Sequence, residues 1–144
     1  MKNRICFVCL GNICRSPMAE YMMKEKLRKR NLLDSFEIVS RATSYEEEGN
    51  DLYPPAKEKL REKGIPFERH YAKRVEKEDF HHFDYFVCME EKNIRELQRI
   101  IGKSDKIIKL LERDISDPWY TGEFEKTYQD LDEGLELFLK RFLS

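Results

Sequence analysis

Residues 4–20 read RICFVCLGNICRSPMAE and place an apolar run, a short polar loop and a helix start in immediate succession. The continuous apolar run at residues 5–8 is typical of a strand buried on both faces of a parallel sheet. Gly11 bounds this run, and Ser16-Pro17 predicts a helix N-cap followed by proline at the first helical position. The stretch therefore predicts a β-strand, a tight loop and an α-helix.

The rest of the chain alternates strand-like apolar runs with helical patterns. Further strands are expected at residues 36–40, 85–89 and 107–111, and helices at residues 16–30, 53–63, 94–101 and 124–142. This alternation predicts a three-layer α/β/α arrangement with a four-stranded parallel sheet, in one domain over residues 1–144. Because ligands of such sheets bind beyond the carboxyl ends of the strands, the loop after the first strand is the predicted phosphate-binding site.

The overall charge of the chain excludes one class of function. Its 144 residues carry 27 Lys and Arg against 28 Asp and Glu, a formal net charge of −1. This balance excludes a nucleic-acid binder driven by bulk positive charge, although it is compatible with a small basic pocket. The sequence offers no apolar stretch near the ~18 residues of a membrane span and no signal-peptide pattern. The expected location is the cytoplasm, with no nucleic-acid and no membrane partner.

Four cysteines, Cys6, Cys9, Cys14 and Cys88, are expected to serve chemistry rather than disulfide cross-links in such a chain. Cys6 and Cys9 have the C-x-x-C spacing of half a zinc site or of a redox pair. A structural zinc site needs a second ligand pair at similar spacing, which the sequence does not offer, so we expect no metal. Cys6 lies inside the apolar run, which favours a buried and inert thiol.

Five residues separate Cys9 from Arg15, between the predicted strand and the predicted helix. Such a loop can surround an anion with backbone N–H groups at a helix N-terminus, and Gly11 and Asn12 tolerate the positive φ of a tight ring. Arg15 can bind two phosphate oxygens at once, and the same N–H groups would stabilise a nucleophilic thiolate at Cys9. A tight turn with an incidental cysteine and arginine is the alternative, but the flanking strand and helix start favour the phosphate site.

Asp117-Pro118-Trp119-Tyr120 follows the last predicted strand, at the same end of the sheet. Phosphoryl transfer from an ester needs an acid that protonates the leaving oxygen, and Asp117 is the candidate. An aspartate that only initiates a turn before proline is the alternative interpretation. Trp119 and Tyr120 favour the catalytic interpretation, because their rings can stack on the ring of a phosphotyrosine.

Residues 8–20 carry the pattern V-C-x-G-N-x-C-R-S-P-x-A-E, which resembles the signature of the low-molecular-weight protein tyrosine phosphatases at every specified position. The resemblance covers nearly the whole chain. It implies hydrolysis of phosphotyrosine monoesters through a cysteinyl-phosphate intermediate, without a metal or organic cofactor. Further positions similar to that family are Ser40, Thr43, Ser44, Gly49, Gly64, Ile65, His70, Ala72, Phe83, Asp84, Tyr85, Met89, Asn93, Asp117, Pro118 and Phe124.

The resemblance also implies roles for individual residues. Cys9 would attack phosphorus, Arg15 would hold the phosphoryl oxygens, and Asp117 would protonate the leaving oxygen and then activate water. Cys14 would form a reversible disulfide with Cys9 on oxidation. The phosphate-binding loop would comprise Leu10, Gly11, Asn12, Ile13, Cys14, Arg15 and Ser16, and the substrate cleft Tyr45, Trp119 and Tyr120.

The surroundings of the loop contain further matches and one departure. The resemblance implies that Ser40 hydrogen-bonds Asn12. It also implies that Glu20 and His70 pair behind the loop, with a solvated surface pair as the alternative. Residues 53–55 read Tyr-Pro-Pro where the family usually has Asp-Pro-Arg, so a different helix start is expected there.

A second departure is the stretch Tyr45-Glu46-Glu47-Glu48, where the family usually has a tryptophan on the far wall of the cleft. Either Tyr45 replaces this aromatic wall or the wall is missing. A run of glutamates is usually a solvated face. If this run borders the cleft, it predicts weaker binding of acidic phosphopeptides.

Three related or rival functions remain for comparison. Protein arginine phosphatases of the same fold carry Thr where this chain has Ile13, which favours phosphotyrosine. Arsenate reductases with a similar loop need a further nearby cysteine pair, and only Cys88 is available. A phosphate-binding module without catalysis would need neither Cys9 nor Asp117. The expected partners are phosphotyrosine proteins, and the expected state is a monomer, with a weak dimer left open.

Overall fold

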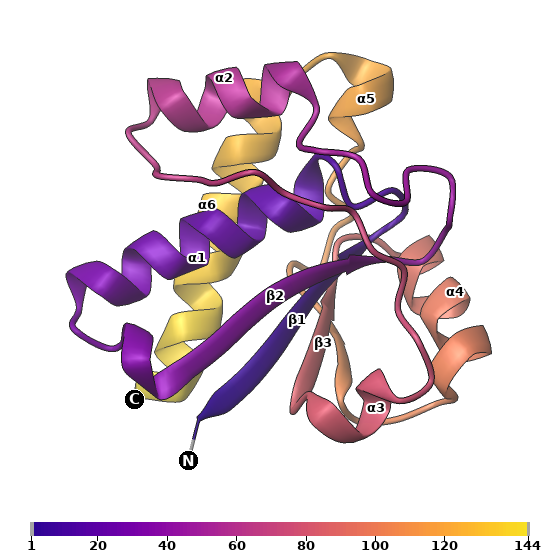
Figure 1. Cartoon of the computed structure of the whole chain (residues 1–144). Helices are drawn as coiled ribbons and strands as arrows, with labels where there is room; N and C mark the ends of the chain where they lie inside the picture. Colours follow the sequence, from indigo (N-terminus) through magenta and orange to yellow (C-terminus); the bar gives the residue numbers. More distant parts are fainter. Residues whose placement is uncertain (1, 144) are drawn as a thin grey trace.

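The computed structural model describes residues 2–143, and a four-stranded parallel sheet lies at its centre (Figure 1). The strands are β1 (Asn3–Cys9), β2 (Phe36–Ala42), β3 (Tyr85–Cys88) and β4 (Ile107–Lys109). Their order across the sheet is β2-β1-β3-β4, and every neighbouring pair is parallel. The chain leaves β1 for β2 on one side and later enters β3 on the other side. The carboxyl end of β1 is therefore the topological switch point at which ligands of such sheets bind.

Helices cover both faces of the sheet, which confirms the predicted three-layer arrangement. In Figure 1, α1 and α6 lie on one side of the strands, and α3 and α4 lie on the other side. The helix α2 packs against α6. The helices are α1 (Arg15–Lys29), α2 (Pro54–Glu62), α3 (Asp79–His82), α4 (Glu91–Ile101), α5 (Pro118–Thr121) and α6 (Phe124–Leu143), with a 3-10 turn, η1, at Leu33–Ser35.

The strand β1 is buried on both faces. Ile5 and Phe7 pack into the core cluster formed with α1 and α6, whereas Cys6 and Val8 pack into the cluster formed with α4. All four side chains are fully buried, because alternate residues of a strand face opposite layers and both layers are present here. This burial makes the strand that ends at Cys9 a rigid base for the loop that follows.

The structure corrects several predicted boundaries. The helix α1 begins at Arg15, and its N-cap is Cys14, without a side-chain capping bond. The predicted N-cap, Ser16, lies inside the first turn because its hydroxyl contacts the preceding loop. The strands β3 and β4 are shorter than predicted, and the helices α3 and α5 were not predicted. Elements of three or four residues are too short to show a hydrophobic period.

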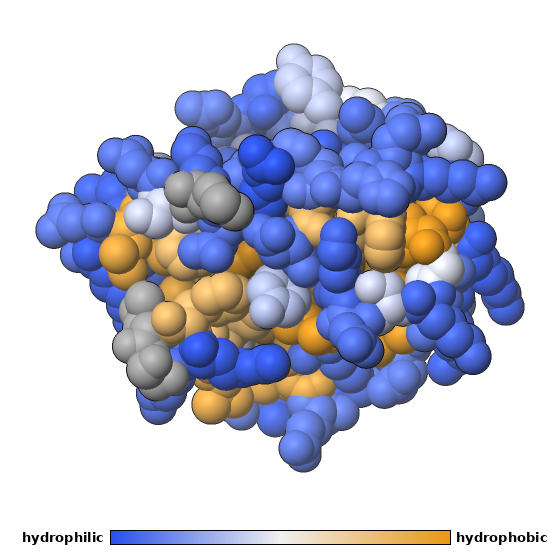
Figure 2. All heavy atoms as spheres, turned by 90° about the horizontal axis from the view of Figure 1, so that it is seen from below, coloured by the Kyte–Doolittle hydropathy of each residue, from blue (hydrophilic) through white to orange (hydrophobic). Residues whose placement is uncertain are grey.

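The surface reflects the high charge of the sequence. Figure 2 views the molecule from below, the side on which both chain ends are marked in Figure 1. Polar and charged side chains cover most of this face, with apolar side chains visible between them. Within residues 2–143, no helix has the combined length and apolarity needed to cross a bilayer.

Candidate active site

The loop from Cys9 to Ser16, here called the Cys9 loop, connects β1 directly to α1. Asn12 has a φ of 62°, in the left-handed region that asparagine tolerates better than most residues. Gly11 does not have the predicted positive φ. Instead, a Cβ atom at Gly11 would lie 3.4 Å from Cγ of Glu47, so glycine leaves room for the neighbouring segment.

Asn12 holds the Cys9 loop from inside the protein. It is fully buried, and its Nδ2 donates to Oγ of Ser16 at 2.8 Å while its Oδ1 accepts from the backbone N of Lys73 at 3.0 Å. Its carbonyl oxygen lies 2.7 Å from Nε2 of His70, which must carry the proton because a carbonyl only accepts. These bonds fix a conformation that the backbone would otherwise adopt only at a cost.

The sulfur of Cys9 faces hydrogen-bond donors. Its Sγ lies 3.0 Å from Oγ of Ser16, and the backbone N of Asn12 donates to it at 3.4 Å. Because Oγ of Ser16 already accepts a bond from Asn12, its own proton can point at the sulfur at 3.0 Å or at the carbonyl oxygen of Arg41 at 3.4 Å. Donors of this kind stabilise a thiolate, which is the nucleophilic form of cysteine.

Arg15 is the charged centre of the site. It is 1% exposed, and its Nη1 donates to the carbonyl oxygen of Ile115 at 2.9 Å. Its Nη1 and Nη2 lie 3.2 Å and 3.3 Å from carboxylate oxygens of Glu90 and Asp117. Burial lowers the pKa of Arg15, but Cys9, Asp117 and Glu90 raise it above its ordinary value, so the guanidinium stays charged. Its buried Nε has no partner among the described residues and can donate to a ligand.

Asp117 is shared between a turn and the arginine. Its Oδ1 accepts from the backbone N of Trp119 at 3.0 Å and caps α5, while its Oδ2 faces Arg15. Asp117 therefore initiates a turn and also lies at the site beside Arg15. We call residues 117–121 the Asp117 turn.

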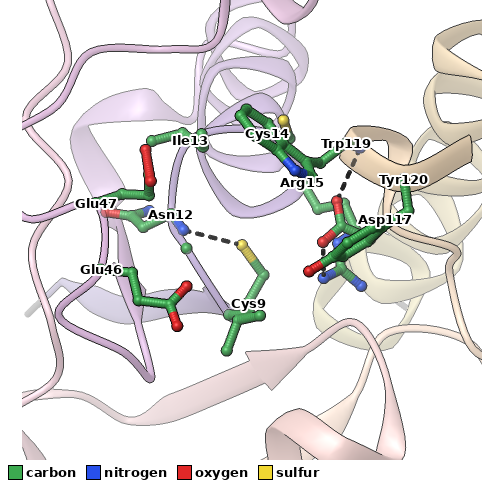
Figure 3. A pocket seen from close by; sticks show the side chains of 12 residues that line it. Cys9, Asn12, Ile13, Cys14, Arg15, Glu46, Glu47, Asp117, Trp119 and Tyr120 are labelled. Carbon is green, nitrogen blue, oxygen red and sulfur yellow. Dashed lines mark hydrogen bonds and ion pairs between the residues drawn. The ribbon is translucent and has the colours of Figure 1, made fainter. Parts of the chain in front are cut away.

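These groups line one pocket beyond the carboxyl end of β1, and Figure 3 shows its two sides. Glu46 and Glu47 lie on one side of Cys9, and the Asp117 turn lies on the other. The pocket thus has an arginine and a sulfur at its base, an aromatic wall and an opposite acidic wall. The lining consists of Cys9, Leu10, Gly11, Asn12, Ile13, Cys14, Arg15, Glu46, Glu47, Asp117, Trp119 and Tyr120.

Comparison with known proteins agrees with this geometry. The sequence model described as "Low molecular weight phosphotyrosine protein phosphatase" matches residues 4–143. The chain belongs to this family. The human protein of the same name is 35% identical over 152 residues, covering 95% of this chain and 94% of its own.

Solved structures of the low molecular weight phosphatase family share the fold. SP-PTP, a low molecular weight protein tyrosine phosphatase from Streptococcus pyogenes, matches with a TM-score of 0.92 and 39% identity, over 100% of this chain and 95% of its own. A Drosophila arginine phosphatase matches with a TM-score of 0.88 and 30% identity, over 100% of this chain and 99% of its own. Proteins of this fold are therefore named both as tyrosine phosphatases and as an arginine phosphatase.

Tyr45 is the predicted cleft residue that this phosphatase does not bring into the pocket lining. Its ring lies 4.5 Å from the guanidinium carbon of Arg74, and its hydroxyl accepts from Nη1 of Arg74 at 3.2 Å. Glu48 is also outside the lining and accepts from the backbone N of Arg74. Glu46 and Glu47 occupy the wall instead, so the run of glutamates does border the cleft.

Residues behind the Cys9 loop differ in detail from the arrangement implied by the resemblance. Ser40 donates to Oε1 of Glu20 at 2.7 Å, while Asn12 is bonded to other groups. Glu20 also pairs with Lys24 at 2.6 Å, whereas His70 bonds the loop itself. Both Glu20 and His70 are buried. The expected pair is therefore replaced by separate contacts, of which the bond from His70 to Asn12 supports the loop.

Glu90 is the site residue that the sequence interpretation missed. It lies two residues beyond the end of β3 and forms a capping box with Asn93 at the start of α4. The available signal was its position, because β3 neighbours β1 and their carboxyl ends share one edge of the sheet. At that edge the carboxylate of Glu90 lies 3.2 Å from the guanidinium of Arg15.

All four cysteines are free and buried. Burial raises the pKa of the Cys14 thiol above its ordinary value, and the neighbouring Cys9 raises it further. Cys14 is thus a neutral thiol beside Cys9, and their disulfide remains a prediction. No group of three His, Cys, Asp or Glu side chains within residues 2–143 is arranged to hold a metal ion.

Proposed function

We propose that Cys9, Arg15 and Asp117 hydrolyse phosphotyrosine esters of proteins by two successive phosphoryl transfers. The thiolate of Cys9 attacks phosphorus, an S–P bond forms, and the bond from phosphorus to the phenolic oxygen breaks. Protonated Asp117 gives its proton to that oxygen, and tyrosine leaves. Water then attacks the phosphocysteine while the carboxylate of Asp117 takes a proton from it, releasing inorganic phosphate and the thiolate.

The observation that carries this proposal is the convergence of three groups on one pocket. The sulfur of Cys9, the guanidinium of Arg15 and the carboxyl of Asp117 all line it, and Arg15 directly faces Asp117. A guanidinium and backbone N–H groups suit the charge that develops on phosphoryl oxygens. The pocket therefore offers a nucleophile, an acid and an anion holder at its base.

The aromatic wall and Ile13 favour phosphotyrosine as the substrate. Trp119 and Tyr120 offer ring faces at the mouth of the pocket. Ile13 lines the same pocket with hydrocarbon only, which suits an aryl ring better than a guanidinium. We further propose the cytoplasm as the location, because Cys9 acts as a reduced thiol and cytosolic thiols stay reduced.

Hydrolysis of p-nitrophenyl phosphate between about pH 5 and about pH 8 tests the mechanism. We expect Cys9→Ser to abolish turnover and Asp117→Ala to lower kcat by about 10²-fold or more. Asp34→Ala is the matched control, because Asp34 is an exposed aspartate in η1, outside the pocket lining. An active Cys9→Ser variant would overturn the nucleophile assignment. An inactive parent that binds phosphate in reducing, metal-free buffer would indicate a binding module.

Phosphopeptides then test the substrate class. Peptides of one sequence, bearing phosphotyrosine or phosphoarginine at the same position, are compared by phosphate release. We expect a kcat/KM at least about tenfold higher for phosphotyrosine, since one unpaired polar group in an apolar site costs about that factor. A preference for phosphoarginine would assign the chain to the arginine phosphatases of this fold.

A further inference from the structure

Tyr53 connects the two parts of the pocket that carry the chemistry. It immediately precedes α2, and its backbone N donates to the carbonyl oxygen of Ile13 in the Cys9 loop at 3.0 Å. Its ring is partly buried against the cluster that contains Ile13 and Cys14. The same ring contacts Trp119 of the Asp117 turn, with ring centroids 4.5 Å apart.

The Asp117 turn depends on such contacts for its position. Its helix, α5, has only four residues, too few to be stable without tertiary support. Trp119 is 49% exposed, so much of its ring faces solvent and few groups hold it. Its backbone N donates to the carboxyl of Asp117. A contact that fixes Trp119 therefore also fixes the carboxyl.

Tyr53 has a second aromatic neighbour. Phe124, at the start of α6, stacks on Tyr53 with ring centroids 6.2 Å apart and an interplanar angle of 29°. The ring of Tyr53 thus contacts both the first residue of α6 and the turn that carries the acid. No hydrogen bond of its hydroxyl is found within residues 2–143, so the ring alone makes these contacts.

We propose that Tyr53 is a positioning residue that holds the carboxyl of Asp117 over the leaving oxygen, acting through Trp119. This inference rests on the proposed function. As the S–P bond forms and the bond to the leaving oxygen breaks, the proton of Asp117 moves to that oxygen. Misplacing the carboxyl slows this step most for an ester whose leaving group is a poor one.

Two esters distinguish positioning from a merely structural role. Phenyl phosphate has a leaving group that needs a proton, whereas 2,4-dinitrophenyl phosphate releases a stable phenolate without one. We expect Tyr53→Ala to lower kcat/KM, which reports the step that releases the phenol, about tenfold or more for phenyl phosphate and less than about threefold for the dinitrophenyl ester. Tyr53→Phe keeps the ring and should restore both rates. Tyr71→Ala is the matched control, because Tyr71 is 65% exposed and stacks on Arg69.

A second measurement needs no turnover. Trp119 is the single tryptophan of the chain, so its fluorescence reports on the contact directly. We expect acrylamide to quench Tyr53→Ala about twofold more strongly than the parent, and Tyr53→Phe as weakly as the parent, with thermal unfolding used to confirm that each variant is folded.

The outcomes separate this inference from the proposed function. If turnover depends on Cys9 but Tyr53→Ala loses kcat/KM equally on both esters, the positioning role is overturned and the proposed function stays intact. Unchanged quenching in Tyr53→Ala also overturns it. Absence of Cys9-dependent turnover on either ester overturns the proposed function and the catalytic part of this inference with it. A selective loss on phenyl phosphate together with stronger quenching supports the inference.

Discussion

The base of the pocket and its mouth are built in opposite ways. At the base, Asn12, Arg15 and Ser16 are at most 1% exposed, and each is hydrogen-bonded within the protein. At the mouth, Trp119 is 49% and Tyr120 is 77% exposed. Under the proposed function, phosphate would be held by buried donors with one arrangement, whereas the substrate would be chosen by side chains that solvent can reach.

Breaking the base should have the largest effect. Replacing Arg15 with Lys keeps a positive charge but removes the planar fork that faces Glu90, Asp117 and the carbonyl oxygen of Ile115. We expect kcat/KM for p-nitrophenyl phosphate to fall by about 10³-fold. Arg113→Lys on the surface serves as the control. A loss smaller than about tenfold would show that charge alone suffices at the base.

His70, which supports the Cys9 loop from behind, should have a smaller effect. This effect is on the free energy of unfolding and depends on pH. Burial lowers the pKa of His70 below its ordinary value, although the carbonyl of Asn12 and the charge of Glu20 partly oppose this. A group with a lowered pKa in the folded state stabilises the fold fully above its unfolded pKa of ~6.5, and this stability is lost as pH falls. We therefore expect the free energy of unfolding of the parent to decrease below about pH 6.5.

The variant His70→Gln sharpens this prediction. It should cost about 1 kcal/mol at about pH 7.5, because the bond to Asn12 is weakened. Its free energy of unfolding should fall less steeply between about pH 6.5 and about pH 5.5, as measured by urea denaturation. The control is His81→Gln, since His81 is exposed. Equal slopes for His70→Gln and the parent would contradict the prediction.

Changing the mouth should have the smallest effect and should depend on the substrate. Glu46 is exposed and lines the acidic wall. We expect Glu46→Gln to raise kcat/KM for acidic phosphopeptides about threefold at low salt. For basic phosphopeptides, kcat/KM should stay equal or fall. Both effects should be small, because exposed charge pairs are weak. Glu48→Gln, outside the lining, is the matched control. If Glu46→Gln and the parent have the same ratio of kcat/KM for acidic and basic phosphopeptides, the acidic wall does not select substrates.

The sequence predicted the residues of the Cys9 loop far better than the contacts that distant segments make around it. Cys9 and Arg15 stand in one short segment, where strand, loop and helix signals combine locally. The same segment gave a wrong start for α1. Ser16 is a residue type that often caps helices, but here its hydroxyl contacts Cys9 instead. Glu90 and Tyr45 depend on contacts between distant segments. No local pattern shows that Glu90 turns toward Arg15, or that Tyr45 turns toward Arg74.

One bond at the base also bears on how the protein is made. The guanidinium of Arg15 donates to the carbonyl oxygen of Ile115, 100 residues further along the chain. A ribosome adds ~5–20 residues per second and releases the N-terminal segment first. The Cys9 loop is therefore synthesised seconds before the carbonyl that holds its arginine exists. A truncated chain that ends before Ile115 has the complete signature but lacks the bond that orients its arginine, so such fragments carry the motif without the finished site.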